Sequence, residues 1–183
     1  MIKEYEEKTS SNFKGTIIDT ETIGEFNGLY RKTNDSRRYE HIKQVIFGFI
    51  SKQGLHIFYV KERKEIPELS KKITGFINQL ERPFYAFNTD FESGVWFHQL
   101  NHKVIFDGEL NREKYEPKAE AIRNLGISNY DDPFYDNGLL CMKAWENRQF
   151  DKAIAHNRAC LLKERDILLQ RGCRPPNALK FHR

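Results

Sequence analysis

The segment Gly15-Thr-Ile-Ile-Asp19-Thr-Glu21-Thr joins an apolar stretch, residues 13–18, to two acids that are separated by one residue. In a β-strand, side chains at positions i and i+2 point to the same face, so Asp19 and Glu21 should project side by side. Parallel carboxylates repel each other unless positive charge lies between them, and a hard divalent cation with oxygen ligands supplies such charge. A polar strand end with two solvated acids is the alternative. The choice between them depends on residues elsewhere in the chain.

The composition is that of one globular domain. The chain has 183 residues, of which 39% are hydrophobic and 31% are charged, so we expect a single domain over residues 1–183. The longest apolar run, residues 45–50, is far too short to span a membrane. The first eight residues mix charges where a signal peptide has an apolar core. Three cysteines without a Cys-x-x-Cys pair fit a reducing compartment. We therefore expect a cytoplasmic protein with no membrane contact.

The net charge of +4 is concentrated at the end of the chain. Four of the 30 basic residues lie in the tail 171–183, which has no acid, so 26 basic side chains remain against 26 acidic ones in the body. Pro175 and Pro176 predict an extended tail rather than a helix. The tail is interpreted either as a solubilising end or as an arm that contacts phosphates.

The order of elements predicts a mixed sheet. Apolar runs and turn residues predict strands at 13–18, 45–50, 55–60, 83–87 and 104–106, with a hairpin turn at 51–54. Apolar residues at helical spacing predict helices at 66–80, 90–99, 117–125, 139–146 and 150–170. Three early strands followed by alternating helices and strands indicate an α/β protein with helices on both faces of a mixed sheet.

Two later segments add polar residues to the first acid pair. Asn88-Thr-Asp90-Phe-Glu92 runs from a strand into the first turn of a helix, where acids are also favoured by capping and by the helix dipole. The segment from His156 to Cys160 lies in the last predicted helix. We expect the Asn88–Glu92 segment to deliver a third acid near the first pair.

Together these three segments resemble the motifs of the DEDD-type 3′–5′ exonucleases, a family of ribonuclease H-like enzymes. Asp19 and Glu21 match the first motif. Glu92 falls on the acid of the second motif, with Asp90 as an alternative two residues earlier. His156 matches the general base of the third motif in spacing.

The resemblance implies a five-stranded ribonuclease H-like sheet, with three antiparallel strands followed by two parallel ones. It also implies a nuclease that hydrolyses phosphodiester bonds at the 3′ end of single-stranded DNA or RNA with two Mg²⁺ or Mn²⁺ ions. Asp19 would bridge the ions, Glu21 and Glu92 would each hold one, and His156 would accept a proton from water at a near-neutral pKa. Four further residues are expected to contact nucleic acid, with the two aromatic ones equally consistent with ordinary packing: Phe26, Tyr30, Asn88 and Asn157.

Cys160 departs from the resemblance because the fourth acid of the family belongs at this position. A neutral thiol is a poor ligand for Mg²⁺, and a thiolate suits zinc better. Glu164 lies one helical turn further on the same face and is the alternative fourth ligand. The other interpretation of Cys160 is a small residue packed under the sheet, which is the usual role of a single cysteine. The alternative function is therefore a weakened or inactive module of the same fold that binds nucleic acid or a protein partner.

Overall fold

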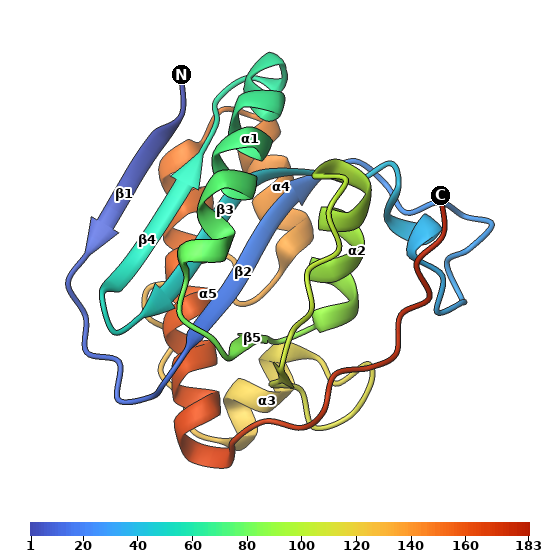
Figure 1. The fold of residues 1–183 in the computed structure, drawn as a ribbon. Coiled ribbons are helices and arrows are strands. Elements are labelled where there is room, and N and C mark those ends of the chain that lie inside the picture. Colours follow the sequence, from blue (N-terminus) through green and yellow to red (C-terminus); the bar gives the residue numbers. More distant parts are fainter.

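A six-stranded mixed sheet forms the centre of the protein in the computed structural model, which describes all residues 1–183 (Figure 1). Its strand order is β1-β4-β3-β2-β5-β6. The four strands β1, β4, β3 and β2 pair antiparallel with their neighbours, whereas β2, β5 and β6 pair in parallel. The bounds are β1 (Lys3–Glu7), β2 (Thr16–Ile23), β3 (Lys43–Ser51), β4 (Gly54–Tyr59), β5 (Phe84–Ala86) and β6 (Gly108–Glu109).

The predicted α/β class and mixed sheet are confirmed, but the predicted number of five strands is wrong. Strand β1 is the additional one, and it lies at the sheet edge beside β4. Its sequence Lys-Glu-Tyr-Glu-Glu is polar because an edge strand needs only backbone pairing on one side and little apolar surface. The strand predicted at 104–106 is also wrong. Val104 and Phe106 are buried without pairing, and the short strand β6 follows them.

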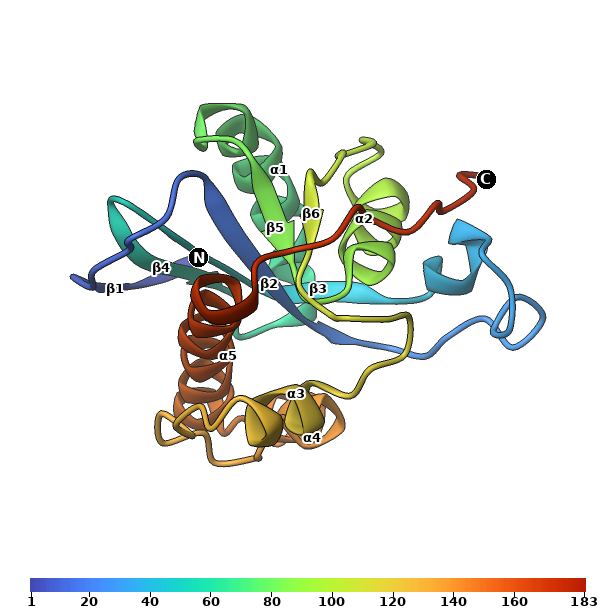
Figure 2. The ribbon, with the colours of Figure 1, turned by 90° about the horizontal axis from the view of Figure 1, so that it is seen from below.

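Helices cover both faces of the sheet. Figure 2 shows α1 and α2 on one side and α3, α4 and α5 on the other. The long helix α5 packs across β2, β3 and β4. No helix combines the length and the apolar character that crossing a membrane requires. The bounds are α1 (Ile66–Phe76), α2 (Thr89–Gln99), α3 (Lys118–Asn124), α4 (Gly138–Glu146) and α5 (Phe150–Arg171).

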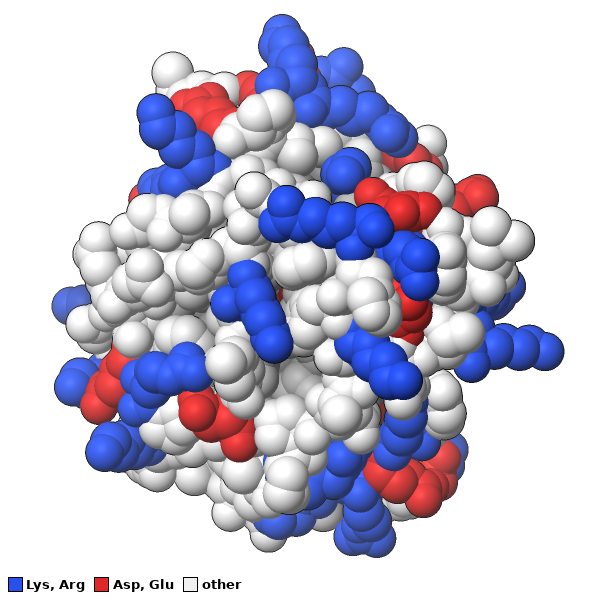
Figure 3. All heavy atoms as spheres, turned by 45° about the vertical axis from the view of Figure 1, so that its right-hand side comes forward, with Lys and Arg blue, Asp and Glu red and all other residues white.

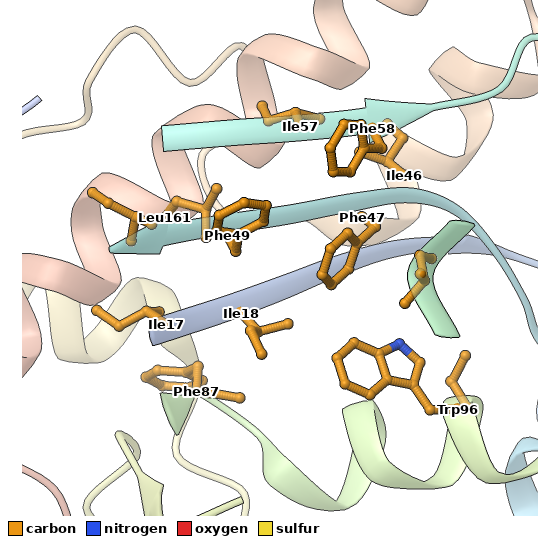
Figure 4. Close-up of a cluster of buried hydrophobic side chains, with 14 of the residues drawn as sticks. Ile17, Ile18, Ile46, Phe47, Phe49, Ile57, Phe58, Phe87, Trp96 and Leu161 are labelled. Carbon is orange, nitrogen blue, oxygen red and sulfur yellow. The ribbon is translucent and has the colours of Figure 1, made fainter. Parts of the chain in front are cut away.

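Aromatic side chains hold the sheet against the first helix layer. Phe47 of β3 contacts Trp96 of α2 at a centroid distance of 5.7 Å (Figure 4). Phe49 contacts Phe76 of α1 at 5.4 Å. Phe47, Phe49 and Trp96 are almost completely buried. Each such side chain contributes about 1.5–3 kcal/mol through burial, so the positions of the central strands are well defined.

Gly48 allows α5 to lie directly on the other face of the sheet. It pairs with Asp19 across the β2–β3 ladder. A Cβ atom at this position would overlap the side-chain amide of Asn157 and would press on Leu161. Because glycine has no side chain, α5 approaches closely enough to place Asn157 beside Asp19.

The basic tail is extended, as predicted, and folds back over its own domain. Figure 2 shows it running from the end of α5 past β6 and α2. Residues 174 and 180 form isolated backbone bridges with residues 109 and 35. Arg171 pairs with Glu116 at 2.7 Å, and Arg174 pairs with Glu109 at 3.2 Å. Two of the four basic side chains in the tail are therefore neutralised by acids of the same chain.

Candidate active site

A cavity of about 580 Å³ lies beside β2, between α2 and the helices of the opposite layer. Four separate elements contribute ionisable side chains to its lining. These include Asp19 and Glu21 of β2, Glu92 of α2, Lys118 of α3, and His156 and Cys160 of α5. Apolar and basic residues complete its rim, and these are Phe26, Arg31, Leu139 and Met142.

Asp19 and Glu21 lie on the face of β2 that α5 covers. The side-chain amide of Asn157 donates to Asp19 Oδ2 at 2.7 Å, and its nitrogen is 3.5 Å from Glu21 Oε1. Asn157 is completely buried. It was expected to contact nucleic acid, but here it contacts the two acids and fixes their positions.

Lys118 supplies positive charge to the acid cluster. Its Nζ atom is 3.1 Å from Asp19 Oδ1 and 2.5 Å from Glu164 Oε1. Burial alone would raise the pKa of Asp19, but the charges of Lys118 and His156 and the hydrogen bonds to Asp19 together outweigh it, and the pKa is lowered. Burial likewise opposes the charge of Lys118, yet Asp19 and neighbouring groups raise its pKa well above the usual value. The sequence predicts a helix that begins near Lys118 but gives no sign of this contact.

Glu164 and Glu92 reach the cluster from two different helices. Glu164 is completely buried, and Glu92 is 5% exposed. In each residue the Oε2 atom is buried without a hydrogen-bond partner. Burial raises the pKa of both carboxyl groups well above the ordinary range. The charge of Asp19 raises that of Glu92 further, whereas the charge of Lys118 only partly offsets the effect of burial at Glu164. Each carboxyl group therefore binds a proton more readily than an exposed glutamate does.

Asp90 lies away from the other predicted metal ligands. Its Oδ2 atom is 3.5 Å from Lys114 Nζ, and the side chain lines a second cavity of about 210 Å³. Glu92 lines the larger cavity with Asp19. The two acids are two residues apart on α2, so their side chains leave the helix in directions about 200° apart.

His156 is fixed by a buried ion-pair network that the sequence did not indicate. Its Nδ1 atom is 2.7 Å from Asp132 Oδ1, and Asp132 Oδ2 is 2.8 Å from Lys163 Nζ. Burial alone would lower the pKa of His156, but neighbouring groups, including Glu21 and Asp132, raise it to about 12. His156 is therefore an imidazolium at neutral pH, not the base of near-neutral pKa that the sequence suggested.

Cys160 and Glu21 complete a group of three possible metal ligands with His156. The Cys160 Sγ atom is 3.7 Å from His156 Nε2, and Glu21 Oε1 is also 3.7 Å from this nitrogen. The three ligand atoms lie within 4.8 Å of one another. Burial raises the pKa of Cys160 to about 11 and that of Glu21 to about 7. Asp19 and Glu92 line the same cavity but do not belong to this close group.

The residues expected to contact nucleic acid are divided between the cavity and its surroundings. Asn88 lines the cavity, and its Oδ1 atom accepts from the Phe91 backbone amide at 3.3 Å as the cap of α2. Phe26 is 41% exposed at the rim and packs edge to face on Phe91 at 6.4 Å. Tyr30 lies outside the cavity lining, with the Arg37 guanidinium 4.1 Å from its ring centroid. Of the two aromatic residues expected to contact nucleic acid, only Phe26 therefore lines the cavity.

Basic side chains are spread over the face that carries the tail and the 24–41 loop. Figure 3 shows Lys and Arg across this face with fewer Asp and Glu among them.

The chain matches no protein-family profile, no curated protein and no solved structure in the three comparisons made with known proteins. Its function is therefore argued from the site.

Proposed function

We propose that the protein is a divalent-metal-dependent 3′–5′ exonuclease with a ribonuclease H-like arrangement, acting on the 3′ end of single-stranded DNA or RNA. One observation carries this proposal. Asp19 and Glu21 on the central strand β2 line one cavity with Glu92 of α2 and His156 of α5. The sheet, in which four antiparallel strands are followed by the parallel strands β5 and β6, supports it further, because the acids lie on β2 where the two parts meet.

The carboxylate set fits Mg²⁺ or Mn²⁺. Asp19, Glu21 and Glu92 would hold the ions with oxygen atoms, which both metals prefer. Glu92 has a buried oxygen without a partner, and an unsatisfied buried acceptor costs about 1–3 kcal/mol that a cation would offset. When bound, the ions would neutralise charge on the phosphate and activate water. The Lys118 ammonium contacts Asp19 Oδ1 and would compete with a metal ion for this oxygen.

Other residues of the chain would position the substrate. The cavity of about 580 Å³ falls within the usual size range of small-ligand sites, which suits one terminal nucleotide better than a duplex. Phe26 at the rim would stack on a base, and Arg31 would contact a phosphate. A cation on Glu21 would repel the proton of His156, which would allow the imidazole to accept a proton.

A second candidate is a module that binds nucleic acid without hydrolysing it. The contact between Lys118 and Asp19 favours this alternative, because the ammonium already neutralises the acid that would bridge the two ions. Such a module would not need a divalent cation.

The test uses 5′-labelled single-stranded DNA and RNA with Mg²⁺, Mn²⁺ or EDTA. The exonuclease proposal predicts metal-dependent shortening that Asp19→Asn abolishes. Asp151→Asn, which alters an exposed acid on α5, is the matched control and should keep full activity. Binding in EDTA without shortening in either metal would favour the module. If the protein neither binds nor shortens the strands, both candidates are contradicted.

A further inference from the structure

Three different donor atoms meet on one side of the cavity. They are a carboxylate oxygen of Glu21, the Nε2 atom of His156 and the Sγ atom of Cys160. Zinc bonds of about 2.0–2.3 Å at tetrahedral angles place ligand atoms about 3.4–3.6 Å apart. The two distances from His156 Nε2, to Glu21 Oε1 and to Cys160 Sγ, are both 3.7 Å. Two of the three donor–donor distances are therefore already close to those of a tetrahedral site, and the third is no longer than 4.8 Å.

The imidazole of His156 is oriented as a metal ligand. Its Nδ1 atom contacts Asp132 at 2.7 Å, and the backbone amides of Phe134 and Asp136 each donate to Asp132 at 2.9 Å. A carboxylate on one ring nitrogen fixes the tautomer that leaves the other nitrogen free to bind metal. His156 Nε2 is that atom, and it faces the other two donors: the Cys160 thiol contacts it at 3.7 Å, and Glu21 Oε1 lies at the same distance.

Helix α5 provides two of the three ligands, and both lie on one face of this helix. His156 and Cys160 are one turn apart, so both side chains project to the same side of the helix. His156 and Cys160 are each 2% exposed, and Glu21 is 8% exposed. Three buried protein ligands leave the fourth position open to the cavity, as in zinc sites that take water or a substrate atom.

We propose that Glu21, His156 and Cys160 bind a zinc-type transition-metal ion. The nitrogen and sulfur donors select for such an ion over Mg²⁺ or Ca²⁺, which require oxygen ligands. Binding would release two protons, one from the Cys160 thiol and one from Nε2 of the His156 imidazolium, and the nearby Lys118 charge favours the thiolate.

This inference goes beyond the proposed nuclease function and does not depend on it. The two share the cavity and Glu21, but the zinc-type site makes His156 a ligand rather than a proton acceptor. Metal binding can be measured without any nucleic acid, so the two hypotheses can fail separately.

The experiment is a titration of the chelator-treated, reduced protein with Co²⁺, which replaces zinc and is coloured. We expect one Co²⁺ per chain, with a sulfur-to-cobalt charge-transfer band in the near ultraviolet that equimolar Zn²⁺ removes. Cys160→Ser should abolish this band. Cys173→Ser, which removes the exposed cysteine, is the matched control and should keep it.

A second variant keeps the test decisive if Cys160→Ser does not fold. His156→Gln removes the nitrogen ligand but keeps the thiol, so the charge-transfer band should persist with an apparent affinity at least tenfold lower. Circular dichroism establishes that each variant is folded. The proposal is overturned if the parent protein shows no charge-transfer band, if the band persists in folded Cys160→Ser, or if folded His156→Gln binds Co²⁺ as tightly as the parent.

Discussion

Replacement of Lys118 by Met removes a positive charge from the acid cluster while keeping most of the side-chain volume. Breaking a buried ion pair by removing one partner costs about 3–5 kcal/mol. The Lys118 side chain is 17% exposed, whereas Glu164 is completely buried. We therefore expect a loss near the lower limit, about 3 kcal/mol in the free energy of unfolding.

A divalent cation should reverse this loss if Lys118 lies where an ion would bind. A ligand present at about 100 times its Kd stabilises the folded state by about 2.7 kcal/mol. Mg²⁺ or Mn²⁺ should therefore restore most of the stability of Lys118→Met and should stabilise the parent protein much less. The assay is urea unfolding, followed by circular dichroism, in EDTA and in a series of metal concentrations.

The matched control is Lys114→Met, which removes a partly exposed lysine paired with Asp90 outside the cluster. It should cost less than about 1 kcal/mol and should show no enhanced response to metal. The reasoning is refuted if Lys118→Met is as stable as the parent in EDTA. It is also refuted if metal stabilises both proteins equally.

Three further substitutions test the geometry around the cavity. Gly48→Ala should lower the free energy of unfolding by about 1–3 kcal/mol, because its Cβ would overlap Asn157, and a melt that matches the parent would contradict this close approach. Burial raises the pKa of Glu21 from 4.5 to about 7, so the free energy of unfolding of the parent should fall by up to about 3 kcal/mol as the pH rises through this range. In urea unfolding, the stability of Glu21→Gln should depend less on pH over the same range. Asp132→Asn should cost about 3–5 kcal/mol in the same assay because it deprives Lys163 of a buried partner, and a loss below 1 kcal/mol would argue against the network.

The sequence predicts those elements whose side-chain pattern matches their burial. The apolar run 45–50 with its turn at 51–54 corresponds to the β3–β4 hairpin, and the helical spacing in 150–170 corresponds to α5. Strand β1 is missed because an edge strand is paired mainly through its backbone. Val104 and Phe106 are apolar because they are buried, although residues 104–106 form no strand and Ile105 between them is exposed.

The site is predictable only where local spacing determines it. The i, i+2 rule places Asp19 and Glu21 on one face of β2, and both line the cavity. Lys118 meets Asp19 across 99 residues of sequence, and no local pattern indicates such a contact. Asp132 precedes a proline, where a turn is expected, but its pairing with His156 depends on how the 126–137 loop packs on α5.

The central claim is metal-dependent removal of nucleotides from a 3′ end. The most direct measurement is a time course with 5′-labelled linear single strands and circular single-stranded DNA of the same sequence, with and without Mn²⁺. We predict that the linear strand shortens one nucleotide at a time, only in metal, while the circle stays intact and Asp19→Asn leaves both unchanged. Cleavage of the circle would show that the enzyme is not an exonuclease. If the linear strands stay unchanged while metal is bound in the active site, the proposed nuclease activity itself is contradicted.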